Sequence, residues 1–293
     1  MRRKLSYHSR FTTFDIPRGG RFNKSGYDRD VEALEALHVW TGTATGLSLW
    51  ENQKEAIALG TAYVRAAQRP GQGEAALIRM PTGSGKSGVI AVLTRCLSDL
   101  RRALVLTPRE GLVQQMHGDI RRRFWANMGC ADAGGGDWHG PGVDPALIRV
   151  LLPNTRRTES ICQQASDHDR VVLIGTLQAL DKVRNDRDRL KRKAMTGPLD
   201  DRQSSELDRL ERILALLATF DLVVVDEGHY EPAPSWSRSV RSLACPTLLL
   251  SATPFRNEYK LSRSAAHLPI TFPSRELPRP RSFATCNSPI WPR

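Results

Sequence analysis

The stretch AALIRMPTGSGKSG at residues 75–88 constrains the fold of this chain more than any other part of the sequence. It starts as a short, mostly apolar run, continues through a glycine-rich turn and opens a helical pattern at Lys86. A strand, a glycine loop and a helix in that order direct backbone N–H groups and the positive end of a helix dipole at one point. The sequence therefore predicts a phosphate-binding loop.

The polar groups of this loop have distinct expected tasks. The N–H groups of residues 82–86 would converge on a β-phosphate, Lys86 would reach the β- and γ-phosphates, and the Ser87 hydroxyl would bind Mg²⁺. Met80 departs from the general pattern, which has Gly or Ala at that position. The alternative is a chance Gly/Ser loop before a helix, and the flanking strand and helix patterns argue against it.

Composition narrows the class of partner. A chain of 293 residues, 40% of them hydrophobic, can form one large or two ordinary domains with a real core. The net charge of +12 indicates a polyanionic partner, nucleic acid first and an anionic membrane surface second. No secretory signal follows the basic N-terminus, and no apolar run is long enough to span a membrane. Five scattered cysteines fit thiols of a reducing cytoplasm better than disulfides or a zinc site.

Residues 1–44 are predicted to form a basic arm followed by a helix. Arginine and lysine are interleaved with phenylalanine over residues 1–28, which is compatible with phosphate contacts, although a loosely ordered arm is the favoured interpretation. A second helix is expected from Trp50 to about Ala67, and it carries Gln53. A carboxamide can donate to adenine and accept from it at once, so the position of Gln53 upstream of the glycine loop makes it an adenine-binding candidate.

Strand and helix patterns alternate after the glycine loop. Apolar residues recur at helical spacing over residues 89–100 and 112–124, and short buried runs separate such segments. This alternation is typical of a mostly parallel sheet with helices on both faces. The expected strands are residues 103–106, 146–152, 170–174, 220–225 and 245–250.

Two stretches interrupt the alternation. Residues 127–145 contain three consecutive glycines and are expected to form a surface loop, whose cysteine, aspartates and histidine lack the spacing of a metal site. Residues 181–219 are a charged insertion that we interpret as two helices joined by a turn at Thr196–Pro198. A solvated helical surface explains its charges best, and contact with nucleic-acid phosphates is the alternative.

The clearest strand pattern, residues 220–225, ends in an acidic pair. Two adjacent carboxylates at a strand end are costly unless they meet a cation, and a magnesium nucleotide would supply one. Asp226 would then hold Mg²⁺ through water, while Glu227 would orient and deprotonate the attacking water. His229 could sense the γ-phosphate.

The last expected strand ends at Ser251, whose hydroxyl, with that of Thr253, could bridge the carboxylate site to a neighbouring surface. Periodicity is lost beyond Leu261, where proline, arginine and serine dominate. Residues 261–293 are therefore predicted to be disordered or not native to the fold.

Several motifs now carry a family resemblance. In order, MPTGSGKS, TPREGLVQQ, GTLQAL, DEGH and SATPFR resemble motifs I, Ia, Ib/Ic, II and III of superfamily 2 helicases and translocases, and WENQKEAI resembles their upstream glutamine motif. The match covers roughly residues 45–258 and points to the DEAD/DEAH-box helicase-like group, on the side of restriction and repair helicases. DEGH and SATPFR differ from RNA DEAD-box proteins, which favours DNA over RNA as the partner.

The resemblance implies an α/β, RecA-like P-loop NTPase domain at residues 45–260 that uses ATP and Mg²⁺. In such a domain the strands ending at Asp226 and Ser251 would lie beside the loop strand, with Glu227 opposite Lys86. The implied catalytic residues are Lys86, Asp226, Glu227 and His229. The implied ATP-binding residues are Gln53, Pro81, Thr82, Gly83, Ser84, Gly85, Lys86 and Ser87, with Ser87 and Asp226 on the metal. The implied DNA-backbone contacts are Thr107, Pro108, Arg109, Gly175 and Thr176, and the implied coupling residues are Ser251 and Thr253.

The resemblance also implies a second RecA-like domain, whose arginine finger stabilises transition-state charge. No such domain fits after Leu261, so we expect a truncated motor that binds ATP, hydrolyses it slowly and does not unwind DNA alone. The alternative is a non-catalytic module that binds nucleotide and DNA. Another P-loop enzyme, such as a kinase, is a weaker option, because TPREGLVQQ and SATPFR argue against it.

Overall fold

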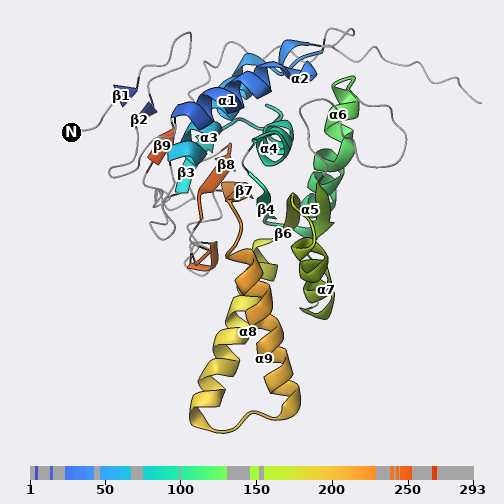
Figure 1. Ribbon diagram of the computed structural model, residues 1–293, viewed down its shortest axis with the longest axis vertical. Helices are drawn as coiled ribbons and strands as arrows, with labels where there is room; N and C mark the ends of the chain where they lie inside the picture. The colour runs from blue at the N-terminus through green and yellow to red at the C-terminus, as the bar shows by residue number, and fades with distance from the viewer. Residues whose placement is uncertain are drawn as a thin grey trace, which may run out of the picture.

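A seven-stranded, all-parallel sheet forms the centre of the part of the chain that the computed structural model describes (Figure 1). Its strand order is β5-β6-β4-β7-β8-β3-β9. The described residues are 4–5, 14–15, 24–42, 47–66, 75–98, 100–130, 146–151, 155–228, 238–240, 242–243, 245–252 and 266–268. The strands are β3 (Ala75–Arg79), β4 (Arg102–Thr107), β5 (Leu147–Val150), β6 (Val171–Thr176), β7 (Leu222–Asp226), β8 (Thr247–Ser251) and β9 (Ala266–Leu268).

Helices cover both faces of this sheet. One buried cluster joins alternate strand residues to α1 (Lys24–Glu35), α2 (His38–Thr41), α3 (Glu51–Ala66), α4 (Lys86–Arg95), α5 (Glu110–Gly118), the π-helical turn η1 (Asp119–Arg123) and α6 (Phe124–Asn127). A second cluster joins the other strand residues to α7 (Thr155–Ser166), α8 (Leu177–Thr196) and α9 (Asp201–Leu217).

The strand β7 shows how the two clusters arise. Val224 belongs to the first cluster, whereas Val223 and Val225 belong to the second. Successive side chains of a strand point to opposite faces, so a strand covered by helices on both sides is apolar at every position. The predicted α/β fold with a parallel sheet and helices on both faces is therefore confirmed.

One predicted neighbour relationship is wrong. We expected the strand of Asp226 beside the loop strand, but β8 lies between β7 and β3. In the register, Arg79 of β3 pairs with Ser251 and Asp226 of β7 pairs with Leu250. A continuous apolar run indicates that a strand is buried on both faces, but it carries no information on the position of that strand within the sheet.

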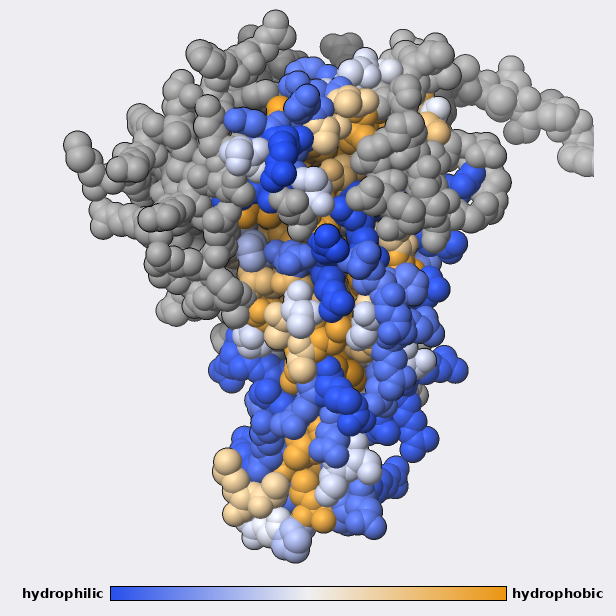
Figure 2. Space-filling model, viewed as in Figure 1, coloured by the Kyte–Doolittle hydropathy of each residue, from blue (hydrophilic) through white to orange (hydrophobic). Residues whose placement is uncertain are grey.

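The predicted insertion at residues 181–219 is a helical hairpin formed by α8 and α9. α8 starts directly after β6, before the predicted insertion, and Asp200 caps α9 by accepting a hydrogen bond from the Gln203 backbone at 2.7 Å. Figure 1 shows the hairpin projecting from the rest of the molecule. Figure 2 shows a mostly hydrophilic hairpin surface with a narrow apolar strip along it. Leu190 in the second half of α8 and Leu210 in the middle of α9 are both buried.

The N-terminal helix α1 is joined to the sheet domain by a buried ion pair. Asp30 is fully buried, and its Oδ2 lies 2.5 Å from the guanidinium of Arg65 in α3. Its Oδ1 accepts hydrogen bonds from the backbone N–H and the hydroxyl of Ser98, at 3.1 and 2.8 Å. A short antiparallel pair, β1 (Lys4–Leu5) and β2 (Phe14–Asp15), lies further towards the N-terminus.

The predicted tail contributes one described element. Ala266–Leu268 forms β9, which pairs in parallel with β3 at the edge of the sheet. The other residues of 261–293 lie outside the described residues, so the predicted disorder there stays a prediction. None of the described helices is both long and apolar enough to cross a membrane.

Candidate nucleotide site

The predicted site residues follow the ends of five adjacent strands. β6 ends at Thr176, β4 at Thr107, β7 at Asp226, β8 at Ser251, and β3 leads into the glycine loop after Arg79. Because all five strands are parallel, their carboxyl ends lie at the same edge of the sheet, where open α/β sheets bind their ligands. The structure thus brings the predicted phosphate, carboxylate and backbone-binding segments to one edge.

The glycine loop is closed by its own polar groups. The Ser84 hydroxyl is buried and donates to the Pro81 carbonyl at 2.6 Å, and the Ser84 N–H donates to the same oxygen at 3.2 Å. Gly83 and Gly85 have φ angles of 80° and 77°, a left-handed conformation that glycine adopts without strain. Gly85 is the N-cap of α4, so the first turn of this helix, from Lys86, carries no side-chain cap. Its N–H groups have the arrangement that binds anions at helix N-termini.

Gln53 lies against this loop. Its Nε2 donates to the carbonyl oxygens of Ser84 and Gly85, at 3.2 and 3.4 Å, and its Oε1 accepts from the Trp50 backbone N–H at 2.9 Å. The side chain is buried. Gln53 therefore links the start of α3 to the phosphate loop, a contact that sequence reasoning did not anticipate, while its predicted role on adenine stays a prediction.

Lys86 and Glu227 lie close together where the glycine loop meets α4. The Nζ of Lys86 lies 3.8 Å from Oε1 of Glu227. Glu227 is the one described non-glycine residue with positive φ, at 53°. Such a conformation is uncommon for a glutamate and is found disproportionately at active sites. The strained turn directs the carboxylate after β7 towards the helix that starts at Lys86.

Asp226 is buried beside Glu227. Its Oδ1 accepts a hydrogen bond from the Glu227 backbone N–H at 3.0 Å. Burial and, to a smaller extent, repulsion from Glu227 together raise the pKa of Asp226 from 3.8 to about 6, while Lys86 and the hydrogen bond from the Glu227 N–H oppose the shift. Two close carboxylates in a buried setting are stabilised when a cation joins them.

Close packing against β8 favours glycine at the residue after the acidic pair. A Cβ at Gly228 would lie 2.7 Å from the Cβ of Leu249 and 3.2 Å from its Cα in the neighbouring strand β8. This close approach gives a physical reason for DEGH where DEAD- and DEAH-box proteins have a larger third residue. His229 lies outside the described residues, so its predicted role stays a prediction.

The predicted nucleic-acid contacts lie at the ends of β4 and β6, which are adjacent. Thr107 is buried and its hydroxyl donates to the carbonyl of Arg109 at 3.1 Å, while Arg109 is exposed at the start of α5. Thr176 caps α8, accepting from the Ala179 N–H at 3.0 Å. The Nε2 of Gln178 donates to the Pro108 carbonyl at 2.8 Å and so joins the two turns.

Ser251 connects the two halves of the site. It is fully buried, and its carbonyl accepts a hydrogen bond from the Met80 N–H at 2.9 Å. β8 places Ser251 between the strand of Asp226 and the loop strand. Thr253, the second predicted coupling residue, lies outside the described residues.

Sequence reasoning missed Gln178 as well as the loop contact of Gln53. Gln178 stands within the GTLQAL motif, but a glutamine on the exposed side of a helix gives no signal of its own. The only available clue was its position two residues after Thr176, at the start of a helix that follows a predicted backbone-binding turn.

The residues present fit a magnesium nucleotide. The Ser87 hydroxyl and the Asp226 carboxylate offer the hard oxygen ligands that Mg²⁺ prefers. No described group of three or more His, Cys, Asp and Glu residues could hold a metal by itself.

The fold and this site define the class as an α/β domain with a parallel sheet, in which a glycine-rich loop leads from β3 into α4. The sequence profile of the family described as type III restriction enzyme, res subunit, matches residues 46–256. The chain belongs to this family, which agrees with the restriction-type helicase resemblance of its motifs.

Two further comparisons complete this picture. No curated protein sequence matches the chain. Among solved structures, the chain is similar to a nuclease-deletion mutant of the Type ISP restriction-modification enzyme LlaGI in complex with a DNA substrate mimic, at 13% sequence identity and a TM-score of 0.44. The similarity covers 74% of this chain and 19% of that one.

Proposed function

We propose that this chain is the ATP-binding and ATP-hydrolysing domain of a DNA helicase or translocase. The observation that carries the proposal is the 3.8 Å approach of Lys86 Nζ to Glu227 Oε1 beside the glycine loop, with Asp226 adjacent. A phosphate-binding loop, a lysine and an acidic pair at one edge of a parallel sheet are the parts that P-loop NTPases use for phosphoryl transfer.

Each group then has one task. The N–H groups of the loop and the Lys86 ammonium bind and orient the phosphates, and Ser87 and Asp226 hold the metal. Mg²⁺–ATP supplies the electrophilic phosphorus and the positive charge beside the acidic pair. Glu227 orients a water molecule and accepts its proton on a carboxylate oxygen, while Lys86 stabilises the charge that develops on the phosphate oxygens.

DNA is the proposed partner of the same sheet edge. Arg109 and the turns at Thr107–Pro108 and Gly175–Thr176 would contact the sugar–phosphate backbone, which carries no sequence information and suits tracking along a strand. The net charge of +12 supports a polyanionic partner. A cytoplasmic location is part of the proposal, and the four described cysteines, all free thiols, fit a reducing compartment.

The test measures Mg²⁺-dependent binding of a fluorescent ATP analogue and phosphate release by the purified chain, with and without DNA. We expect ATP binding, slow hydrolysis that DNA accelerates, and no strand separation. Lys86→Ala should weaken nucleotide binding at least tenfold, whereas Lys54→Ala, which removes a half-buried lysine of α3 that pairs with Glu51, should not. Glu227→Gln should keep binding within threefold and lower hydrolysis at least 100-fold.

The outcomes separate the candidate functions. Nucleotide binding that survives Lys86→Ala unchanged would contradict the proposal. Lys86-dependent binding without any phosphate release, with or without DNA, would instead identify a non-catalytic nucleotide- and DNA-binding module.

A further inference from the structure

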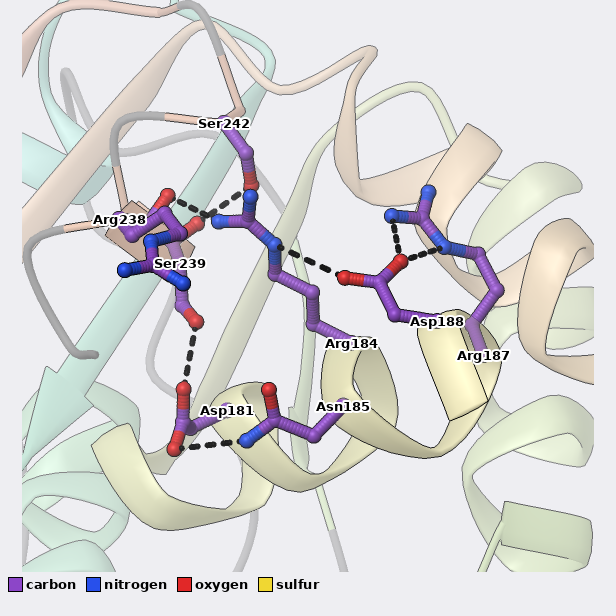
Figure 3. A network of polar contacts seen from close by, with 8 residues as sticks. All are labelled: Asp181, Arg184, Asn185, Arg187, Asp188, Arg238, Ser239 and Ser242. Atoms are coloured by element: carbon purple, nitrogen blue, oxygen red, sulfur yellow. Dashed lines mark hydrogen bonds and ion pairs between the residues drawn. The ribbon is translucent and has the colours of Figure 1, made fainter. Parts of the chain in front are cut away.

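One face of α8 carries a network of polar contacts to another part of the chain (Figure 3). Asp181, Arg184, Asn185 and Asp188 follow one another at spacings of three, one and three residues, so they lie on the same side of the helix. The opposite partner consists of the described residues 238–240 and 242–243, which we call the segment 238–243 and which precede β8. Leucines of α8 and residues of this segment also share the second buried cluster.

The network fixes this segment at two points. The hydroxyl of Ser239, which is 1% exposed, donates to Oδ1 of Asp181 at 2.8 Å. The guanidinium of Arg184 donates to the carbonyl of Arg238. The amide of Asn185 donates to Oδ2 of Asp181 at 3.1 Å and so orients the carboxylate. Hydrogen bonds in which one partner is charged are stronger than those between neutral groups.

Apolar packing supports the same contact. Val240 and Leu243 are 1% and 3% exposed and lie in one cluster with Leu177 and Leu180 of α8. The segment is thus seated on the first turns of the helix by both polar and apolar groups. Movement of the start of α8 would have to move the segment as well.

The two ends of this connection lie in different parts of the proposed site. Thr176, a proposed DNA contact, is the N-cap of α8, and Gln178 joins the helix to the other proposed contact by donating to the Pro108 carbonyl at 2.8 Å. The segment 238–243 leads into β8, which ends at Ser251 between the loop strand and the strand of Asp226. α8 therefore connects the proposed DNA-contacting turns with the segment that leads into β8.

We propose that Asp181 and Arg184 are positioning residues that couple DNA contact at Gly175–Thr176 to the nucleotide site through the segment 238–243 and β8. The inference rests on the proposed function, since it concerns how the two ligands of that site influence each other. Coupling of this kind is a ratio of affinities, and it is reciprocal between the two ligands. Ordinary surface ion pairs of the same helix, such as Lys182 with Asp186 at 2.6 Å, connect only residues within α8 and would not contribute.

The experiment measures the dissociation constant of a fluorescent, slowly hydrolysed ATP analogue with Mg²⁺, with and without a saturating single-stranded oligonucleotide. For the unmodified chain we expect DNA to change this constant at least fivefold. Asp181→Ala and Arg184→Ala should reduce the change to less than twofold. The affinity for each ligand alone should stay within twofold of the unmodified chain, because neither residue contacts a ligand.

Matched variants isolate the contact. Asp186→Ala removes the same charge from the same helix and should leave the coupling ratio unchanged. Asp181→Asn, whose amide oxygen can still accept from Ser239, should keep most of the coupling. Ser239→Ala removes the same hydrogen bond from the other partner with little change in volume, and it should abolish the coupling. Thermal unfolding shows whether each variant is folded. If Asp181→Ala is unfolded, Ser239→Ala provides the test.

Three results would overturn the inference. These are a normal coupling ratio in Asp181→Ala and Ser239→Ala, an equal loss in Asp186→Ala, and a ratio of one in the unmodified chain. If nucleotide binding does not depend on Lys86, the proposed function fails and the coupling fails with it. If nucleotide binding depends on Lys86 but the coupling ratio is unchanged in Asp181→Ala, the proposed function stands and only the coupling inference fails.

Discussion

A Cβ atom at residue 85 would lie 2.0 Å from Nε2 of Gln53, so the glutamine occupies the space beside the phosphate loop that a glycine leaves open. The same amide donates to the Gly85 carbonyl, and the φ of 77° at Gly85 independently favours glycine. Gln53 and Gly85 are therefore one structural unit, although they belong to different sequence motifs.

Gln53→Ala is expected to weaken binding of Mg²⁺–ATP about tenfold, equivalent to about 1.4 kcal/mol. The substitution removes the two donors that hold the loop carbonyls of Ser84 and Gly85. Because these contacts are to the loop, GTP binding should fall by a similar factor. Competition of ATP and GTP against a fluorescent nucleotide measures both. A loss confined to ATP would instead assign the carboxamide to adenine.

Gly228→Ala is expected to lower the free energy of unfolding by roughly 1–3 kcal/mol, because the new methyl group would meet the Cβ and backbone of Leu249. Urea denaturation provides the measurement. Gly111→Ala is the matched control. Nothing lies within 4 Å of a Cβ at Gly111, in α5, so this variant should be unchanged or stabilised by up to about 1 kcal/mol. Equal stability of both variants would contradict the close packing of β7 and β8 at the site.

Six of the seven strands and their assignment to a parallel sheet were predictable because of how burial works in this fold, whereas β9 lies in the predicted tail and was not expected. Helices on both faces require an apolar residue at nearly every strand position, so the run Leu222–Val225 stands out in the sequence. The phosphate loop was predictable for a related reason, since few arrangements other than a tight turn before a helix need two glycines and a lysine at this spacing.

The sheet order and the polar contacts were not predictable from single residues. The insertion of β8 between β7 and β3 depends on which apolar runs pack best together, and all of these runs look alike in sequence. Gln178 binds the Pro108 carbonyl and Asp181 binds the buried Ser239. A glutamine or an aspartate at such a helix position is equally common when it only faces water, so the sequence does not reveal these contacts. The positive φ of Glu227 likewise has no sequence signature.

Asp226→Asn is expected to stabilise the ligand-free protein at pH 7. The pKa of Asp226 is raised from 3.8 to about 6, so the folded protein holds this proton more tightly than the unfolded chain does. The free energy of unfolding contributed by this group therefore falls as the pH rises from 3.8 to about 6, and the full cost is present above that range. Asparagine removes this cost, which we place at roughly 1–3 kcal/mol from about 1.4 kcal/mol per pKa unit.

Urea denaturation of the two proteins between pH 4 and pH 8 measures this difference. It should be largest at pH 7 and disappear near pH 4, whereas Asp186→Asn, on the surface of α8, should show no such trend. The same Asp226→Asn variant should lose the stabilisation that Mg²⁺ with a nucleotide gives the unmodified chain. If Asp226→Asn is less stable than the unmodified chain at pH 7, the ionised Asp226 carboxylate does not destabilise the folded protein and the prediction is wrong.

Asp30→Ala is expected to destabilise the protein by about 3–5 kcal/mol, the usual consequence of removing one partner of a buried ion pair. Asp30 is fully buried, and its loss leaves the Arg65 guanidinium without this carboxylate and the Ser98 N–H without its acceptor. Asp28→Ala, on the exposed side of the same helix, should change stability by less than about 0.5 kcal/mol. Urea denaturation of both variants gives the comparison.

If the sheet domain unfolded with unchanged stability in Asp30→Ala while α1 alone became susceptible to proteolysis, α1 would not be part of the cooperative folding unit. A shared loss of stability would instead place the structural start of the domain at α1, upstream of the first helicase-like motif.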